Sequence, residues 1–171
     1  MRASVVTMSG ESQFPRTSAW DRPGFLMWHA TLRFQRASAA ALAPLGITQT
    51  QFRMLASVVW LEENSEGPPS QRMLADHTAA DAMMTSQVVR ALEGAGLLVR
   101  DPDPHDNRVK RLRATTAGRK IAEEAIRAIA QADMEFFGSG DDWQESIEVM
   151  RRLAGRDDSG DLVDDRWQRD P

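Results

Sequence analysis

The 171-residue sequence predicts a mainly α-helical protein with a small β-wing, a winged helix-turn-helix joined to a helical dimerisation domain. Apolar residues recur mostly at the three-and-four spacing of helical faces. Residues 81–113 instead read as one helix followed by two short strands. We expect a single domain over residues 21–154, between a flexible N-terminal arm (1–20) and a disordered acidic tail (155–171).

The composition is that of a globular protein and narrows the classes of function. Hydrophobic residues make up 42% and charged residues 27%, and no apolar run approaches the roughly 20 residues that span a bilayer. The N-terminus lacks the apolar core of a secretory signal, so we expect a cytoplasmic protein without membrane association. The absence of Cys excludes a disulfide framework and thiolate chemistry.

The formal net charge of −4 is unevenly distributed along the chain. Residues 70–120 contain nine Lys or Arg against six Asp or Glu, whereas residues 121–171 contain six against fourteen. The local field, not the total charge, decides whether phosphate is attracted. The basic excess coincides with the helix and strands of 81–113, so the acidic total does not exclude nucleic-acid binding.

Capping residues mark the first two helices. Pro23 favours a helix that runs to about Pro44, and Gly46 supplies its left-handed cap. Thr48 and Gln51 form a capping box that opens a second helix. The expected core face of the second helix consists of Phe52, Leu55, Val58 and Val59, closed by Trp60 and Leu61.

Residues 62–69 read as a loop, and two short helices follow it. Ser70 caps the first, residues 77–80 form a tight connection, and Asp81 caps the second. Two short helices joined in this way are the helix-turn-helix pattern. The expected buried face of the second helix consists of Thr85, Val88, Val89 and Leu92, and Gly94 and Gly96 end it.

Two strands follow, at residues 97–99 and 109–114, and they convert the helix-turn-helix into a winged helix. Thr115 then caps a helix that reaches about Phe137, and a final helix spans residues 141–154. Nothing further in the chain can cover the apolar row of the final helix, so a second subunit is its natural cover. This row consists of Trp143, Ile147, Met150 and Leu153.

A series of short motifs over residues 22–154 resembles the MarR-type winged-helix transcriptional regulators, in unbroken order. The motifs are Leu45-Gly46-Ile47-Thr48 with Gln51-Phe52, Leu74-Ala75, Met83-Met84-Thr85-Ser86-Gln87, Leu92-Glu93, Gly96-Leu97, Asp106-x-Arg108 and Thr115-Thr116-Ala117-Gly118. The sequence departs from the family at Ala114, where Leu is usual. The lack of Cys excludes the family's thiol-oxidising sensors.

The resemblance implies a homodimer whose first and last helices intertwine. Residues 21–47 and 115–154 are then dimerisation helices, and residues 48–114 form a DNA-binding lobe. It also implies a sequence-specific repressor on a palindromic double-stranded operator, released by a small, often aromatic, effector. The expected dimer contacts are Phe25, Trp143, Ile147 and Met150.

The exposed face of the helix after Asp81 carries groups that suit base edges in the major groove. Gln87 matches the paired N6 and N7 of adenine, Ser86 donates or accepts, and Arg90 reaches a guanine or a phosphate. Ala82 and Met83 can lie against thymine methyl groups. The alternative is an ordinary amphipathic helix with a solvated face, but the adjoining basic hairpin favours DNA contact.

In the hairpin, Arg108 resembles the arginine that this family places in the minor groove, where narrow A·T-rich segments attract cations. Asp106 is expected to pair with an arginine and hold the tip in shape. Lys110, Arg111 and Arg113 are candidates for phosphate contacts, although alternate residues of a ribbon face away. The alternative is that these cations only keep a flexible hairpin soluble.

An effector pocket is expected from Trp28 and His29 on the first helix with Phe52 and Arg53 on the second. Such an apolar slot with a polar contact suits a small aromatic carboxylate. Taken one by one, Trp28 and Phe52 are more simply explained as core, and Arg53 as a solvated side chain.

No constellation typical of catalysis, metal binding or cofactor binding appears in the sequence. There is no Ser/His/Asp arrangement or phosphate loop, and His77 and His105 lie in expected loops without neighbouring ligands. We therefore expect no enzyme activity, no cofactor and no metal. The alternative function is a protein-interaction module whose basic wing meets an acidic partner instead of operator DNA.

Overall fold

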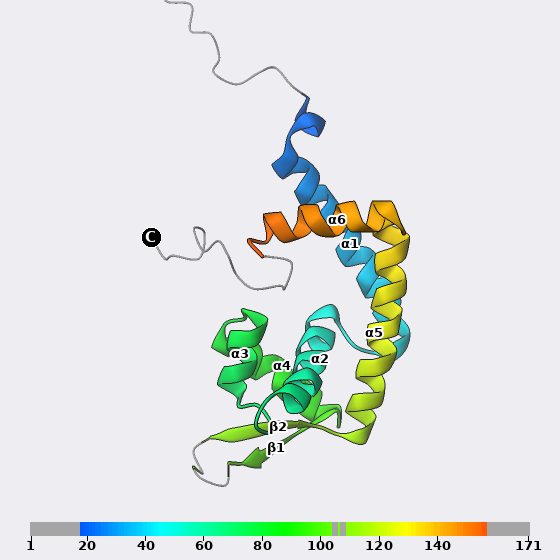
Figure 1. The fold of residues 1–171 in the computed structure, drawn as a ribbon. Helices are drawn as coiled ribbons and strands as arrows, with labels where there is room; N and C mark the ends of the chain where they lie inside the picture. The colour runs from blue at the N-terminus through cyan, green and yellow to red at the C-terminus, as the bar shows by residue number, and fades with distance from the viewer. Residues whose placement is uncertain (1–17, 104–105, 107–108, 157–171) are drawn as a thin grey trace, which may run out of the picture. The chain divides into compact units, whose positions relative to one another are not determined.

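The computed structural model describes residues 18–103, 106 and 109–156 (Figure 1). It is mainly helical with one two-stranded antiparallel sheet, which confirms the predicted fold class. The chain divides into two compact units between Phe34 and Gln35, inside helix α1 (Pro23–Leu42). The expected arm and tail lie almost wholly outside the described residues.

The first unit contains the short 3-10 helix η1 (Ala19–Asp21) and the first part of α1. Three aromatic rings gather there around His29, whose ring centroid lies 5.0 Å from that of Trp20, 4.5 Å from that of Phe25 and 4.8 Å from that of Trp28. Trp20, assigned to the flexible arm from the sequence, therefore packs on α1. Trp28 is 54% exposed, so this cluster is not a buried core.

The second unit contains the rest of α1 and all later elements. Figure 1 shows α2, α3 and α4 gathered against the sheet, while α5 leads from the end of β2 to α6. These elements are η2 (Ala43–Leu45), α2 (Gln49–Asn64), α3 (Gln71–Thr78), α4 (Ala82–Gly94), β1 (Leu98–Pro102), β2 (Lys110–Ala114), α5 (Thr116–Phe137) and α6 (Asp141–Leu153).

The capping residues begin the helices where the sequence predicts. Thr48 and Gln51 form both hydrogen bonds of the capping box. Ser70, Asp81 and Thr115 each accept a first-turn backbone N–H through the side chain. A side-chain cap of this kind stabilises a helix by about 1 kcal/mol, so these residues define the helix starts locally.

The core lies where α2, α4 and α5 meet the sheet and the end of α1. Burying one aliphatic side chain contributes about 1.5–3 kcal/mol. Because the core residues come from helix-turn-helix, wing and long helices alike, these parts stabilise one another. The core side chains with no exposed surface, among the described residues, are Leu42, Met54, Leu55, Val58, Leu74, Val89, Leu92, Leu112 and Ala125.

Helix α5 begins in close contact with the chain that enters β1. A Cβ atom on Gly118 would lie 2.0 Å from the carbonyl oxygen of Leu97, so only glycine fits there. Thr115 donates its backbone N–H to the same oxygen at 3.1 Å and its hydroxyl to the carbonyl of Gly96 at 2.8 Å. These contacts tie the wing to the start of α5.

Helix α2 extends to Asn64, beyond the end expected at Leu61, so the predicted loop starts later. The reason is a tertiary contact of Glu62, whose side chain is 7% exposed. Its carboxylate accepts from Nη2 of Arg119 at 2.7 Å and from the backbone N–H of Ala114 at 3.3 Å. This ion pair joins α2 to the start of α5.

Two aromatic residues differ from their expected positions. Trp60, expected to close the core face of α2, is 51% exposed and stacks on His77, with ring centroids 5.0 Å apart. His77, expected in a loop, lies in the last turn of α3. The helix-turn-helix connection is correspondingly shorter, and Ala79 adopts a left-handed φ of 50° in it.

Strand β1 is also shifted from its expected position. It begins at Leu98 because the backbone N–H of Leu97 still donates to the carbonyl of Leu92, at 2.9 Å, and so belongs to the end of α4. It continues to Pro102, which pairs with Lys110. Among the described residues, no helix is both long and apolar enough to cross a membrane.

Candidate nucleic-acid interface

Helix α4 has a fully buried face and an exposed one. Thr85, Val89 and Leu92 have no exposed surface, and the Thr85 hydroxyl is satisfied by the carbonyl of Asp81 at 2.8 Å. This burial fixes the rotation of the helix about its axis. The side chains on the other side are Ala82, Met83, Gln87 and Arg90, all exposed, and the half-buried Ser86.

Two polar groups on this exposed face are joined to each other. Nη2 of Arg90 donates to Oγ of Ser86 at 3.0 Å, across one helical turn. The Ser86 hydroxyl then still has its own hydrogen to donate, and Arg90 has further N–H groups. The pair therefore presents donors to any acceptor that approaches this face, next to the amide of Gln87.

The start of α3 lies beside the wing. One hollow there is lined by Ser70, Gln71, Arg72, Val109 and Lys110. Arg72 and Lys110, both exposed, thus contribute cations to the same surface as the N-terminal turn of α3. Gln71 and Arg72 were not identified from the sequence, although their position directly after the capping Ser70 was a usable signal.

A buried carboxylate, which the sequence pattern does not single out, lies at the tip end of the wing, directly after the strand pair of Pro102 and Lys110. Asp103 is 4% exposed. Its Oδ2 accepts from Nε of Arg111, and its Oδ1 accepts from the backbone N–H of Asp106 at 3.0 Å. Nη1 of Arg111 also donates to the carbonyl of Pro68 at 3.1 Å.

This geometry does not support the expected phosphate contact of Arg111. Its guanidinium lies against Asp103 and the loop before α3, because the Leu112 N–H donates to the carbonyl of Pro69 at 2.8 Å and holds β2 alongside that loop. The pairing of Asp106 with an arginine stays a prediction. Arg108 and His105 lie outside the described residues.

Two further ion pairs brace the hairpin. Arg100 of β1 binds Glu93 of α4, and Nε of Arg113 lies 3.3 Å from Oδ2 of Asp101 on the opposite strand. The hydrogen bond from Arg100 lowers the pKa of the Glu93 carboxyl, and the positive charge of the guanidinium acts in the same direction. The Arg100 pair connects the wing directly to α4.

The expected effector and dimer residues are distributed over both units. Trp28 and His29 belong to the first, whereas Phe52, half-buried, and Arg53, exposed, belong to the second; the pocket they would form together stays a prediction. Phe25 contacts Trp28 and His29 within the first unit.

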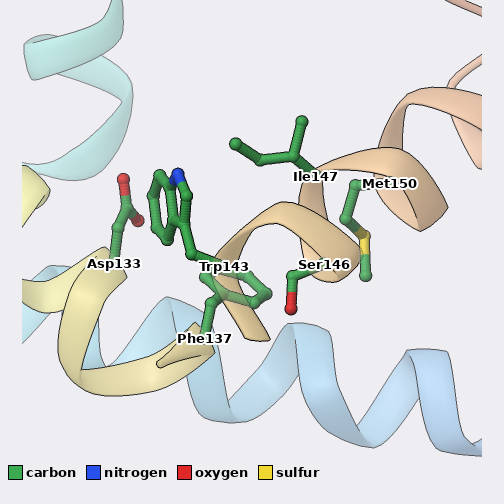
Figure 2. A pocket seen from close by; sticks show the side chains of 6 residues that line it. All are labelled: Asp133, Phe137, Trp143, Ser146, Ile147 and Met150. Carbon is green, nitrogen blue, oxygen red and sulfur yellow. The ribbon is translucent and has the colours of Figure 1, made fainter. Parts of the chain in front are cut away.

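Helix α6 buries none of its residues. Trp143 and Ile147 are half-buried, and Met150 is 46% exposed. These side chains line an open hollow of about 180 Å³ together with Asp133, Phe137 and Ser146 (Figure 2). Their role in a dimer stays a prediction. Across the described ranges, no group of three or more His, Asp or Glu is placed to hold a metal ion.

Comparisons with known proteins agree with this architecture. Residues 47–110 match the profile of the MarR family. The HTH-type transcriptional regulator YdcH of Bacillus subtilis is 35% identical over 77% of this chain and 88% of its own length. The HTH-type transcriptional repressor Rv2887 of Mycobacterium tuberculosis is 30% identical over 64% of this chain and 76% of its own.

A solved structure shows the same fold. CouR from Rhodococcus jostii RHA1, bound to p-coumaroyl-CoA, matches with a TM-score of 0.67 at 27% identity, covering 81% of this chain and 93% of CouR. The chain belongs to the MarR family of HTH-type transcriptional regulators.

Proposed function

We propose that this chain is a homodimeric repressor that binds a palindromic operator through α4 and the wing, and that a small molecule releases it. The observation that carries the proposal is the exposed polar face of α4, which lies opposite a fully buried face, together with the exposed cations Arg72 of α3 and Lys110 of the wing. Two relatives, from Mycobacterium tuberculosis and Mycobacterium bovis, are transcriptional repressors, which supports repression rather than activation.

Helix α4 reads base edges in the major groove. Gln87 binds an adenine through its amide, while the joined pair of Ser86 and Arg90 donates to guanine or phosphate acceptors. Ala82 and Met83, at the exposed start of the helix, lie against thymine methyl groups.

The surface beside α4 binds the DNA backbone. Lys110 of the wing and Arg72 of α3 contact neighbouring phosphates, because they line one hollow. Arg108 enters the minor groove, by its resemblance to the family's wing arginine. Arg111 instead fixes the wing through Asp103, with Asp106 supporting the tip.

Dimerisation places two such reading surfaces on one duplex. The uncovered row of α6, with Trp143, Ile147 and Met150, and Phe25 of α1 form the contact between subunits. Half-sites about one helical turn apart then match the two-fold symmetry of the protein.

The effector is a small aromatic molecule. CouR, one of the similar proteins of known structure, was crystallised with p-coumaroyl-CoA, which contains an aromatic acyl group. The apolar rings of Trp28 and Phe52, with His29 and Arg53 as polar contacts, suit such a group.

Selection of bound fragments from sheared genomic DNA, followed by titration at several salt concentrations, tests this function. We expect a recurring palindromic sequence and an affinity that falls steeply with salt. No binding to selected or random duplexes at low salt would exclude operator binding and favour the protein-interaction module.

A further inference from the structure

The hollow between α5 and α6 has a single carboxylate among mostly apolar walls. Phe137, Trp143, Ile147 and Met150 supply the apolar lining, and Asp133 supplies the carboxylate. Figure 2 shows Asp133 on α5 and Trp143 on α6 lying beside each other at this opening. The hollow therefore presents a carboxylate beside an aromatic ring.

Asp133 is unpaired within the described part of the chain. Burial raises the pKa of the Asp133 carboxyl, and no neighbouring cation lowers it. Asp133 is half-buried at an open hollow, so water still reaches its carboxylate in the single chain. A partner that covered the hollow would remove this water, and an ionised carboxylate in apolar surroundings is unfavourable unless it is paired. A cation from outside this chain would satisfy it.

Helix α6 also lacks a cover. It buries none of its residues, whereas α2, α3, α4 and α5 each bury at least two. Its apolar row is continuous with the hollow, because Trp143, Ile147 and Met150 belong to both. An apolar face of this kind on an oligomeric protein is covered by the same face of a second copy.

We propose that a second copy of this chain covers α6 and places an arginine side chain in the hollow, where it binds Asp133. The inference rests on the proposed homodimer and adds an ion pair that fixes how the two chains align. An arginine fits because its aliphatic stem can lie along Phe137 and Ile147 while its guanidinium reaches the carboxylate and stacks on Trp143. Two-fold symmetry gives two such pairs per dimer.

The supplying arginine lies on α1, α5 or α6, the helices expected to dimerise. A lysine is a weaker candidate for this role. These three helices contain one lysine, Lys120, and it pairs with Glu124 within the chain. Arg119 is likewise bound to Glu62 and Glu63. Arg33 and Arg151 also have partners within the chain. The candidates are therefore Arg36, Arg127 and Arg152.

Sedimentation equilibrium of the full chain and its Asp133→Asn variant tests the pair. We expect the dimer Kd to rise about tenfold or more, because truncating one member of a buried ion pair leaves the other charge unpaired. Asp133→Glu, which keeps the charge, should lose less. Glu123→Gln removes the same charge from an exposed position of α5 and should leave Kd unchanged.

If no cation enters the hollow, Asp133→Asn should not raise the dimer Kd. A neutral amide is then easier to bury than a carboxylate, and Asp133→Asn tightens the dimer or leaves it unchanged. Either result, with a wild-type chain that dimerises, overturns the inference and leaves the homodimer intact. A wild-type chain that stays monomeric overturns the homodimer itself.

Double-mutant cycles then identify the arginine. Each candidate is changed to Gln alone and together with Asp133→Asn, and the dimer Kd is measured. For the arginine that binds Asp133, the change to Gln should raise the dimer Kd in the wild-type background but have little further effect in the Asp133→Asn background. Independent effects for all three candidates would overturn the proposal.

Discussion

The buried carboxylate of Asp103 binds the guanidinium of Arg111 toward the tip end of the wing. From there Arg111 also reaches the carbonyl of Pro68, in the loop that precedes α3. One arginine thereby joins the wing to the first helix of the helix-turn-helix. The position of the wing against the start of α3, which a groove and its flanking phosphates require, depends on this pair.

Replacement of Asp103 by Asn should therefore loosen the wing. Removing a hydrogen-bonded charge from a buried site costs about 1–3 kcal/mol, so urea unfolding should show that loss in the free energy of unfolding. Operator affinity, measured by fluorescence anisotropy, should fall several-fold. Asp101→Asn is the control, because Asp101 and its partner Arg113 are about half exposed and the pair contributes at most about 1 kcal/mol. Equal effects of both variants would contradict the assigned role.

Gln87 and Lys110 should affect DNA binding in different ways. Gln87→Ala should change which base is preferred at one position of the half-site, because it removes a base-edge contact. This is measured by titrating duplexes that carry each base at that position. A Gln87→Ala protein with the wild-type order of preference would show that Gln87 does not read a base.

Lys110→Ala should weaken binding to all duplexes to a similar extent. It should also reduce the slope of log affinity against log salt by about one, because one phosphate contact is lost. Lys120→Ala, in α5, removes the same charge away from the wing and serves as control. A slope that is unchanged by Lys110→Ala would place this lysine away from the DNA.

Gly118→Ala should destabilise the protein by about 1–3 kcal/mol or more, as expected for overpacking against backbone. The added Cβ would lie 2.0 Å from the Leu97 carbonyl oxygen, so the start of α5 must move away from the wing. Gly94→Ala is the matched control, since nothing lies within 4 Å of its Cβ position. Thermal unfolding of both variants checks the difference, and equal Tm values would refute the close approach.

The Glu93–Arg100 pair predicts a pH dependence. The folded-state pKa of Glu93 is lowered from 4.5, so its contribution to stability is present above that value and is lost as the pH falls through the lowered pKa. Glu93→Gln should reduce the decline of the unfolding free energy in this acid range and leave its pH dependence near neutrality unchanged. Urea unfolding over a pH series measures this decline. If Glu93→Gln left the fall of the unfolding free energy at acid pH unaltered, the pair would not form.

Local signals in the sequence were enough to predict the fold class and most helix starts. Thr48, Ser70, Asp81 and Thr115 act through hydrogen bonds within three residues, so their neighbours in sequence suffice to identify them. Periodicity likewise predicts the buried Thr85, Val89 and Leu92 of α4, whereas Val88, expected on the same face, is half-buried.

Long-range contacts explain what the sequence did not reveal. The extension of α2 depends on Glu62 meeting Arg119, 57 positions away, and the inward turn of Arg111 depends on Asp103 and Pro68. Strand alternation alone does not show which cation of a basic run finds a carboxylate. The exposed stacking of Trp60 on His77 likewise joins two helices that periodicity treats separately.

The most direct test of operator recognition compares a selected palindromic duplex with one in which a single half-site is scrambled. Stoichiometric titration, with light scattering of the complex, should show two chains per intact duplex. The scrambled half-site should lower the affinity by at least about a hundredfold, because one of the two α4 helices loses its base contacts. Equal affinity for both duplexes, or saturation at one chain per duplex, would contradict a dimer that reads two half-sites.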